Sequence, residues 1–176
     1  MLSDLARNPE IWDEFNERRT APNSPHQGMT DVWVRARARD ELTNPLALRE
    51  AHYPVFYPVW AKLPSMHHVV WTLMAMAKGT HLGNVLITRI PPGGQILPHV
   101  DTGWAPEHFD QKFYIVLAGN EAVTNYCGEG DEEEAVVMLP GSIWAFENRV
   151  SHRVINNGET DRISLIVTLR SDGTCP

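Results

Sequence analysis

Hydrophobic and polar positions alternate with a period of two through most of the C-terminal half of the chain. Such alternation, interrupted by turn pairs such as Pro140-Gly141 and Asn157-Gly158, is typical of short antiparallel strands. We expect eight strands, which run from Gly83 to the turn at Pro91 and then over residues 95–100, 112–117, 122–127, 135–139, 142–146, 152–155 and 162–169. Strands at this even spacing predict an antiparallel barrel or jelly roll.

The N-terminal half carries helical patterns and one strand pattern, so the predicted fold is mainly β with N-terminal helices packed on one sheet. The expected elements are a helix from the Asn8-Pro9 cap to Arg19, a strand over 32–39, a short helix over 57–63 and a longer helix that Ser65 caps. We expect a single domain over residues 1–176, with the helices and a flanking strand in 1–82 and the β core in 83–170.

The composition is that of a globular domain that folds alone, with 176 residues, 43% of them hydrophobic and 21% charged. The formal charge of −7 argues against binding to nucleic acid or to an anionic membrane, because both need an excess of Lys and Arg. A small-molecule or peptide substrate is therefore expected. Cys127 and Cys175 cannot build a disulfide scaffold or a cysteine-based zinc site, and no secretory signal is evident, so we expect a cytoplasmic location.

Three side chains of the predicted barrel suit a metal ion. His99 and Asp101 lie two residues apart at the end of a strand, so both side chains point to the same side. His152 begins a later strand, and neighbouring strands of a jelly roll can bring it to the same point. Two imidazoles and one carboxylate on one face of a metal are the ligand set of non-haem Fe(II) oxygenases. Zinc hydrolases more often show HExxH or a third histidine, so we favour iron.

Arg162 and Ser164 share one face of the last predicted strand. We expect the hairpin through Asn157-Gly158 to place Arg162 roughly opposite His152 on the neighbouring strand. A guanidinium can bind a carboxylate through two parallel hydrogen bonds, and the serine hydroxyl can add a third. The arrangement suits a dicarboxylate that bridges the metal and Arg162.

The spacing of His99-x-Asp101, His152 and Arg162-x-Ser164 resembles the signature of Fe(II)/2-oxoglutarate-dependent dioxygenases. Further motifs make the chain similar to the aspartyl/asparaginyl β-hydroxylase family, over about half of its length. These motifs are Pro92-Gly93, Leu97-Pro98-His99, Phe146-Glu147-Asn148, Ser151-His152-Arg153-Val154 and Asp161-Arg162-Ile163-Ser164-Leu165-Ile166-Val167 within 83–170, and Ser24-Pro25-His26 and Asp31-Val32-Trp33-Val34-Arg35 before it.

The resemblance implies a double-stranded β-helix, related to the cupins, in which His99, Asp101 and His152 hold Fe(II). The residues implied to contact 2-oxoglutarate are Arg162, which binds its distal carboxylate, Thr88, Lys112 and Tyr114. The implied reaction uses O₂, converts 2-oxoglutarate to succinate and CO₂, and hydroxylates a C–H bond of an amino acid, a peptide side chain or a similar small polar substrate. The founding members have Gly at the position of Asp101, so the complete triad resembles the wider superfamily.

Two other functions stay open on the residues alone. A cupin-type metalloenzyme, such as an isomerase or a dioxygenase that needs no cosubstrate, would bind metal but would be indifferent to 2-oxoglutarate and to Arg162. A non-catalytic ligand-binding cupin would keep the fold and show no dependence on iron.

Two groups of side chains outside the metal and cosubstrate motifs also stand out. Trp104 and His108 follow the metal-binding pair in a loop expected to overlie the open side of the metal, and we expect them to contact the substrate. Arg35, Arg37 and Arg39 form a basic face, which we expect to be solvated rather than to bind an anion.

Overall fold

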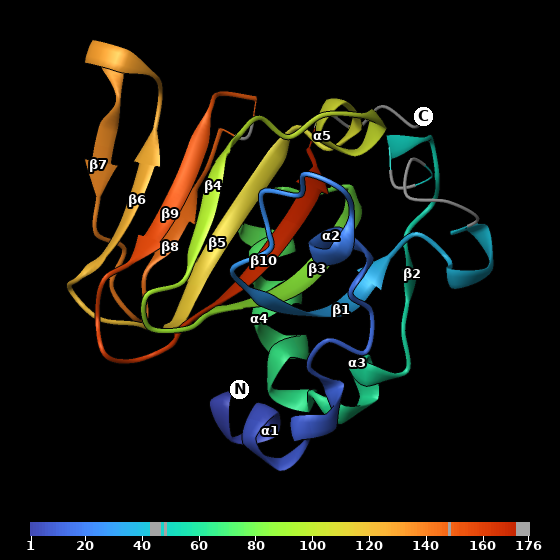
Figure 1. The fold of residues 1–176 in the computed structure, drawn as a ribbon. Coiled ribbons are helices and arrows are strands. Elements are labelled where there is room, and N and C mark those ends of the chain that lie inside the picture. Colours follow the sequence, from blue (N-terminus) through green and yellow to red (C-terminus); the bar gives the residue numbers. More distant parts are fainter. Residues whose placement is uncertain (43–46, 48, 148, 172–176) are drawn as a thin grey trace.

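The computed structural model describes residues 1–42, 47, 49–147 and 149–171; Asn148 and Cys175 lie outside these ranges. Two antiparallel sheets face each other, one with the strand order β2-β1-β3-β10-β5-β8 and one with the order β4-β9-β6-β7 (Figure 1). The strands are β1 (Thr30–Ala36), β2 (Val55–Phe56), β3 (His81–Ile90), β4 (Gln95–His99), β5 (Gln111–Ala118), β6 (Val123–Cys127), β7 (Glu134–Val136), β8 (Ile143–Ala145), β9 (His152–Asn156) and β10 (Arg162–Arg170).

This arrangement is the predicted double-stranded β-helix, or jelly roll. All eight strands expected after residue 83 are present as β3 to β10, with ends that differ from the prediction by a few residues. The strand expected over 32–39 is β1, which joins the edge of the larger sheet through β3. The short strand β2 then pairs with β1.

The helices are short, and most of them lie on the outer side of the larger sheet (Figure 1). They are α1 (Leu2–Arg7), α2 (Glu17–Thr20), α3 (Val59–Lys62), α4 (Pro64–Met76) and α5 (Trp104–His108), with 3₁₀ turns at Pro9–Ile11, Arg39–Glu41 and Gly130–Glu132. Ser65 is not the cap of α4. The carboxylate of Asp4 instead accepts the backbone N–H of Ser65 at 3.0 Å, which joins α1 to the start of α4. None of the helices in the described ranges is long and apolar enough to cross a membrane.

The single helix predicted from Asn8 to Arg19 is wrong. Asp13 adopts a φ of 57°, a conformation that no right-handed helix can continue, so a 3₁₀ turn and α2 replace it. The backbone N–H of Asp13 donates instead to the carbonyl of Asp31 on β1 at 3.0 Å. Pairing with the sheet therefore outweighs the local helical pattern at this position.

The hairpin expected between the strands of His152 and Arg162 is also wrong. β9 pairs with β4 and β6 in the smaller sheet, whereas β10 pairs with β3 and β5 in the larger one. The connection through Asn157-Gly158 therefore crosses from one sheet to the other. Asn156 holds this crossing, because its side-chain amide donates to the carbonyls of Ile90 at 3.0 Å and Thr160 at 2.9 Å.

The two faces of the larger sheet differ in polarity. Ile87 and Leu165 are cross-strand partners on the outer face, where they are fully buried with residues of α4 in the main core. Thr88 and Ser164 are the next pair and point to the space between the sheets, where both are also almost fully buried. The helices thus cover an apolar face, while the interior of the double sheet contains buried polar groups.

The segment before β1 packs directly on β4, the strand that ends at His99. The backbone N–H of Leu97 donates to the carbonyl of Pro25 at 2.9 Å. At Gly28 the two backbones come so close that an added Cβ would lie 2.5 Å from the carbonyl oxygen of Gln95. The absence of a side chain at Gly28 therefore allows the N-terminal segment to lie beside the strand of His99.

Replacement of Gly28 tests this close approach. We expect Gly28→Ala to destabilise the protein by about 1–3 kcal/mol, because the new methyl group meets backbone atoms that cannot turn away. Gly119→Ala is the matched control, since a Cβ there has ordinary contacts at 3.7 Å and 3.9 Å. Urea unfolding measures both changes, and equal stabilities of the two variants would contradict the packing described here.

Candidate metal centre

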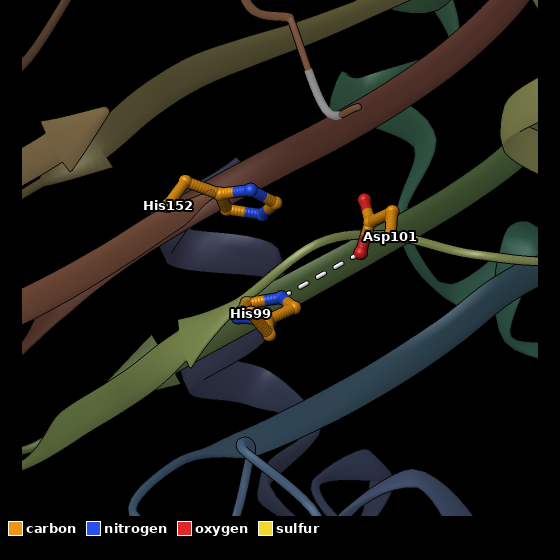
Figure 2. A group of neighbouring side chains, drawn as sticks. All are labelled: His99, Asp101 and His152. Atoms are coloured by element: carbon orange, nitrogen blue, oxygen red, sulfur yellow. Dashed lines mark ion pairs between the residues drawn. The ribbon is translucent and has the colours of Figure 1, made fainter. Parts of the chain in front are cut away.

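His99, Asp101 and His152 point to one location between the sheets (Figure 2). His99 and His152 are directly paired residues of the neighbouring strands β4 and β9, and their ring centroids lie 4.2 Å apart. Asp101 follows β4, and its Oδ1 lies 3.5 Å from Nε2 of His99. One potential ligand atom from each side chain lies within 4.8 Å of the other two. The three side chains predicted from the sequence are therefore brought together. This group of three, the metal cluster, has dimensions that suit one metal ion.

Backbone carbonyls orient both imidazoles of the cluster. Nδ1 of His99 lies 2.8 Å from the carbonyl of Leu97, and Nδ1 of His152 lies 2.9 Å from the carbonyl of Val150. Because a carbonyl oxygen can only accept, Nδ1 carries the proton in each neutral ring. The Nε2 atoms are left as lone-pair donors, as metal ligation requires.

A buried lysine holds the carboxylate of the cluster. The Nζ of Lys112 donates to Oδ2 of Asp101, so the other oxygen stays directed toward the imidazoles. Burial works to raise the pKa of Asp101, but the charge of Lys112 and the contact with His99 outweigh burial and lower this pKa below its usual range. Asp101 is therefore ionised and oriented.

His152 shows a mismatch that a metal ion would remove. The residue is only 4% exposed, and its Nε2 has no hydrogen-bond partner within the described part of the chain. Burial, followed by the nearby charge of Lys112, lowers the pKa of His152 to about 4, so its ring is neutral at neutral pH. A buried, neutral imidazole with an unpaired lone pair fits a metal ligand.

A cavity of about 380 Å³ opens beside the cluster. The cluster residues line it, as do Thr88, Lys112 and Tyr114, which were expected to face a cosubstrate. Arg162 does not line it, but its Cζ lies 5.5 Å from the ring centroid of Tyr114. The cavity thus extends from the cluster toward the surroundings of Arg162, although the two lie on different sheets.

The guanidinium of Arg162 is fully buried and incompletely paired. Its Nη2 donates to Oδ1 of Asn125 on β6 at 3.2 Å, while Nε and Nη1 have no partner among the described residues. The hydroxyls of Thr88 and Ser164 likewise have no hydrogen-bond partner among the described residues. Burial lowers the pKa of Arg162 to about 10, so the side chain keeps its charge at neutral pH. A buried cation beside two free hydroxyls fits a carboxylate ligand.

The two side chains expected to contact substrate lie next to the cavity rather than in its wall. Trp104 and His108 lie in α5, and their rings stack on each other with centroids 4.2 Å apart. Their neighbours Ala105 and Pro106 line the cavity instead. Contact of Trp104 or His108 with a substrate stays a prediction.

The arginines of the predicted basic face make contacts that were not expected. Arg35 donates to the carbonyl of Leu82, Arg37 pairs with Glu41, and Arg39 pairs with Glu17. These side chains are therefore not a free basic surface, because partners within the chain occupy them.

Three residues near the site were not found from the sequence. The ring of His26 meets the ring of His99 edge-on at 4.8 Å, and Arg18 donates to His26 at 3.1 Å. Asn125 binds Arg162 from the opposite sheet. None of the three lies at a characteristic sequence spacing from the metal ligands. Only His26 is part of a motif noted in the sequence, Ser24-Pro25-His26.

A model of the aspartyl/asparaginyl β-hydroxylase family matches residues 55–171, about two thirds of the chain. The chain belongs to this family. This match confirms the resemblance drawn from the motifs. Because the family is one of β-hydroxylases, the chain is an enzyme of the hydroxylase class. No curated protein matches the chain in a sequence comparison.

Solved structures share the family's fold at low sequence identity. A 2OG-Fe(II) oxygenase family oxidoreductase from Burkholderia pseudomallei is 12% identical, with a TM-score of 0.61 over 97% of this chain and 79% of the other. A prolyl-4-hydroxylase from Pseudomonas putida is 14% identical, with a TM-score of 0.52 over 98% and 84% of the two chains. At these identities the likeness shows the fold alone.

Removal of one imidazole tests whether the cluster binds metal. We expect the protein to bind one Co(II) ion per chain, and His152→Ala to weaken binding by more than about 100-fold, since even indirect partners of a ligand are worth 10–100-fold. His68→Ala is the control, because His68 is exposed on α4. Anaerobic titration followed by visible absorption measures the affinities. Unchanged affinity in His152→Ala would rule out this site.

Proposed function

We propose that this chain is a hydroxylase that uses Fe(II), 2-oxoglutarate and O₂ to hydroxylate a C–H bond of an amino acid, a peptide side chain or a similar small polar substrate. One observation carries the proposal: unpaired buried polar atoms occur at two places, one in the cavity wall and one beside it. They are Nε2 of His152, a residue that lines the cavity, and the guanidinium of Arg162 with its neighbouring hydroxyls, next to Tyr114 of the cavity wall. A metal ion and a dicarboxylate would satisfy both.

The donor set of the metal centre fits Fe(II). His99, Asp101 and His152 would hold the ion on one face and leave other coordination positions for the cosubstrate and O₂. When bound, Fe(II) supplies the activation of O₂, which no side chain of the protein can perform. The contribution of the protein is to present two imidazoles, each oriented by a backbone carbonyl, and one oriented carboxylate in a partly enclosed cavity.

Arg162 would bind the distal carboxylate of 2-oxoglutarate. Its unpaired Nε and Nη1 are N–H donors on two edges of the guanidinium, either of which can donate to a carboxylate, and Ser164 and Thr88 can add hydroxyl donors. Lys112 and Tyr114 line the wall between Arg162 and the metal cluster, where they can contact the rest of the cosubstrate. The cosubstrate would thus be held along its whole length, which limits the orientations that it can adopt.

The buried arginine also favours this function over a cupin enzyme that needs no cosubstrate. Among the described residues Arg162 has no carboxylate partner, and an uncompensated buried cation is unfavourable. A metalloenzyme without a dicarboxylate ligand would have no use for this charge. A small-molecule or peptide partner and a cytoplasmic location stay predictions of the same proposal.

Anaerobic spectroscopy tests the cosubstrate directly. We expect Fe(II) and 2-oxoglutarate together to give a visible charge-transfer band, which Asp101→Ala abolishes. Arg162→Met should weaken 2-oxoglutarate binding by about tenfold to 100-fold, the loss expected when a charged hydrogen-bond partner is removed, while Co(II) binding stays unchanged. A band that is indifferent to 2-oxoglutarate or to Arg162→Met would favour the cosubstrate-independent cupin instead.

Asn125 supplies a sharper test, because it can be changed without a change of size. We expect Asn125→Asp to weaken 2-oxoglutarate binding by about tenfold or more, since a carboxylate there neutralises Arg162 and repels a dianion. Asn125→Ala keeps the charge of Arg162 available, so its loss should be smaller. The shift in melting temperature that 2-oxoglutarate causes in each variant measures binding. Equal shifts in Asn125→Asp and in the unmodified protein would contradict the assignment.

A further inference from the structure

The N-terminal region contributes one wall of the cavity. None of the proposed contacts to the metal or to the cosubstrate involves a residue of this wall. Residues 21–26, together with Arg18 from α2 and Arg49, form this wall. Arg18 and Arg49 precede residues 55–171, which match the family, so they are features of this chain beyond the matched region. The wall is where an organic substrate could meet the metal cluster.

The charge of the cavity has the opposite sign to that of the chain. The protein carries a formal charge of −7, yet the charged residues that line the cavity are Arg18, Arg49, Lys112, Glu17 and Asp101. Asp101 and Lys112 pair with each other. Glu17 pairs at 3.1 Å with Arg39, which does not line the cavity. The cationic residues of the N-terminal wall are therefore Arg49 and Arg18, of which Arg18 also pairs with Asp31 at 3.2 Å.

Arg18 is held in place by its neighbours. Its Nη1 donates to Oδ2 of Asp31 at 3.2 Å, and its Nη2 lies 3.1 Å from Nε2 of His26. These two contacts leave donors free, because a guanidinium carries five N–H groups. Asp31 is an ion-pair partner on one side of the guanidinium of Arg18. The side chain of Arg18 is 21% exposed, which limits its motion.

His26 connects Arg18 to the metal cluster. Its ring packs edge-on against the ring of His99 at 4.8 Å, so Arg18 lies one side chain away from a metal ligand. Any group that binds Arg18 from the cavity is therefore close to the cluster. This proximity is what a hydroxylase needs from a residue that positions its substrate.

Arg49 approaches the same wall from another direction. Its backbone packs against Gly103, where an added Cβ would lie 2.8 Å from Cβ and 2.9 Å from Cα of Arg49. Gly103 has a φ of 100° and follows Asp101 by two residues. The loop that carries the metal ligand thus packs against the main chain of Arg49, a residue that lines the cavity.

We propose that Arg18 and Arg49 form a binding site for an anionic group, a carboxylate or a phosphate, on the organic substrate. This inference rests on the proposed function, because it assigns the second organic ligand of the same cavity. The two guanidiniums bind the anion, and the remainder of the substrate extends toward the metal cluster. The substrate is therefore an organic anion rather than a neutral molecule.

A paramagnetic metal tests this site without knowledge of the natural substrate. The protein is loaded with Mn(II) and saturated with 2-oxoglutarate under anaerobic conditions, and ¹³C-labelled malonate or methyl phosphate is then titrated. We expect the Mn(II) to enhance the ¹³C or ³¹P relaxation of at least one probe in a saturable manner. The probe that responds decides between carboxylate and phosphate. An excess of 2-oxoglutarate must not displace it, since displacement would place the anion in the cosubstrate site and overturn the inference.

Substitutions of Arg49 test the contribution of one guanidinium to the affinity for the probe. Arg49→Gln should weaken probe binding by about tenfold, as expected for loss of a charged hydrogen bond. Arg49→Lys should weaken it less. Lys62→Gln on α3 is the charge-matched control, because Lys62 is a half-exposed residue outside the cavity wall, and it should leave the affinity unchanged.

Failure of this inference and failure of the proposed function give different results. A protein that binds neither Mn(II) nor 2-oxoglutarate contradicts the proposed function. A protein that binds both, but shows no saturable enhancement or the same probe affinity in Arg49→Gln, contradicts the anion site alone. Arg18→Lys serves as a second variant, since it keeps the positive charge beside Asp31, and it should reduce probe affinity without loss of 2-oxoglutarate binding.

Discussion

A buried guanidinium is the constraint on which the interior of this protein depends. Arg162 has no exposed surface, and moving a charge from water into a protein costs several kcal/mol unless hydrogen bonds compensate. Asn125 and the nearby ring of Tyr114 compensate only in part. The protein can hold such a group because helices cover the apolar outer face of the larger sheet and supply its main core. Binding of a carboxylate at Arg162 would then also stabilise the fold, since only the folded chain presents the site.

The division of the fold into two sheets sets the dimensions of the site. The histidines of the metal cluster lie on β4 and β9 of the smaller sheet, whereas Arg162 lies on β10 of the larger one. A ligand that contacts both must therefore cross the space between the sheets. The crossing connection that follows Asn156 maintains this separation, because the amide of Asn156 binds a carbonyl at the end of β3 as well as one within the connection. Had β9 and β10 formed a hairpin, the metal and the guanidinium would have been neighbours on one surface.

Much of the fold and the metal cluster could be predicted because both rest on local periodicity. Alternation located the strands, and His99-x-Asp101 at a strand end places two ligands on one side whatever the rest of the chain does. The wrong predictions concern contacts between distant parts of the chain. Asp13 leaves the helical region to pair with β1, and β9 and β10 pair in different sheets instead of forming a hairpin. The contact of Gly28 with Gln95 was not predicted, because no side-chain pattern marks it. Asn125 was missed for the same reason, since an amide that orients a buried arginine needs no fixed spacing from it.

Lys112 links the electrostatics of the metal cluster to those of the proposed cosubstrate site. Its ammonium group donates to Oδ2 of Asp101 and keeps that carboxylate ionised. The other oxygen, Oδ1, is left available to a metal. The same charge lowers the pKa of His152 and repels a divalent cation. A metal ion alone thus meets an opposing charge, and Arg162 adds a second positive charge behind Tyr114. A dianion placed between the metal, Lys112 and Arg162 relieves both repulsions. On this balance of charges, metal and 2-oxoglutarate should each bind more tightly in the presence of the other.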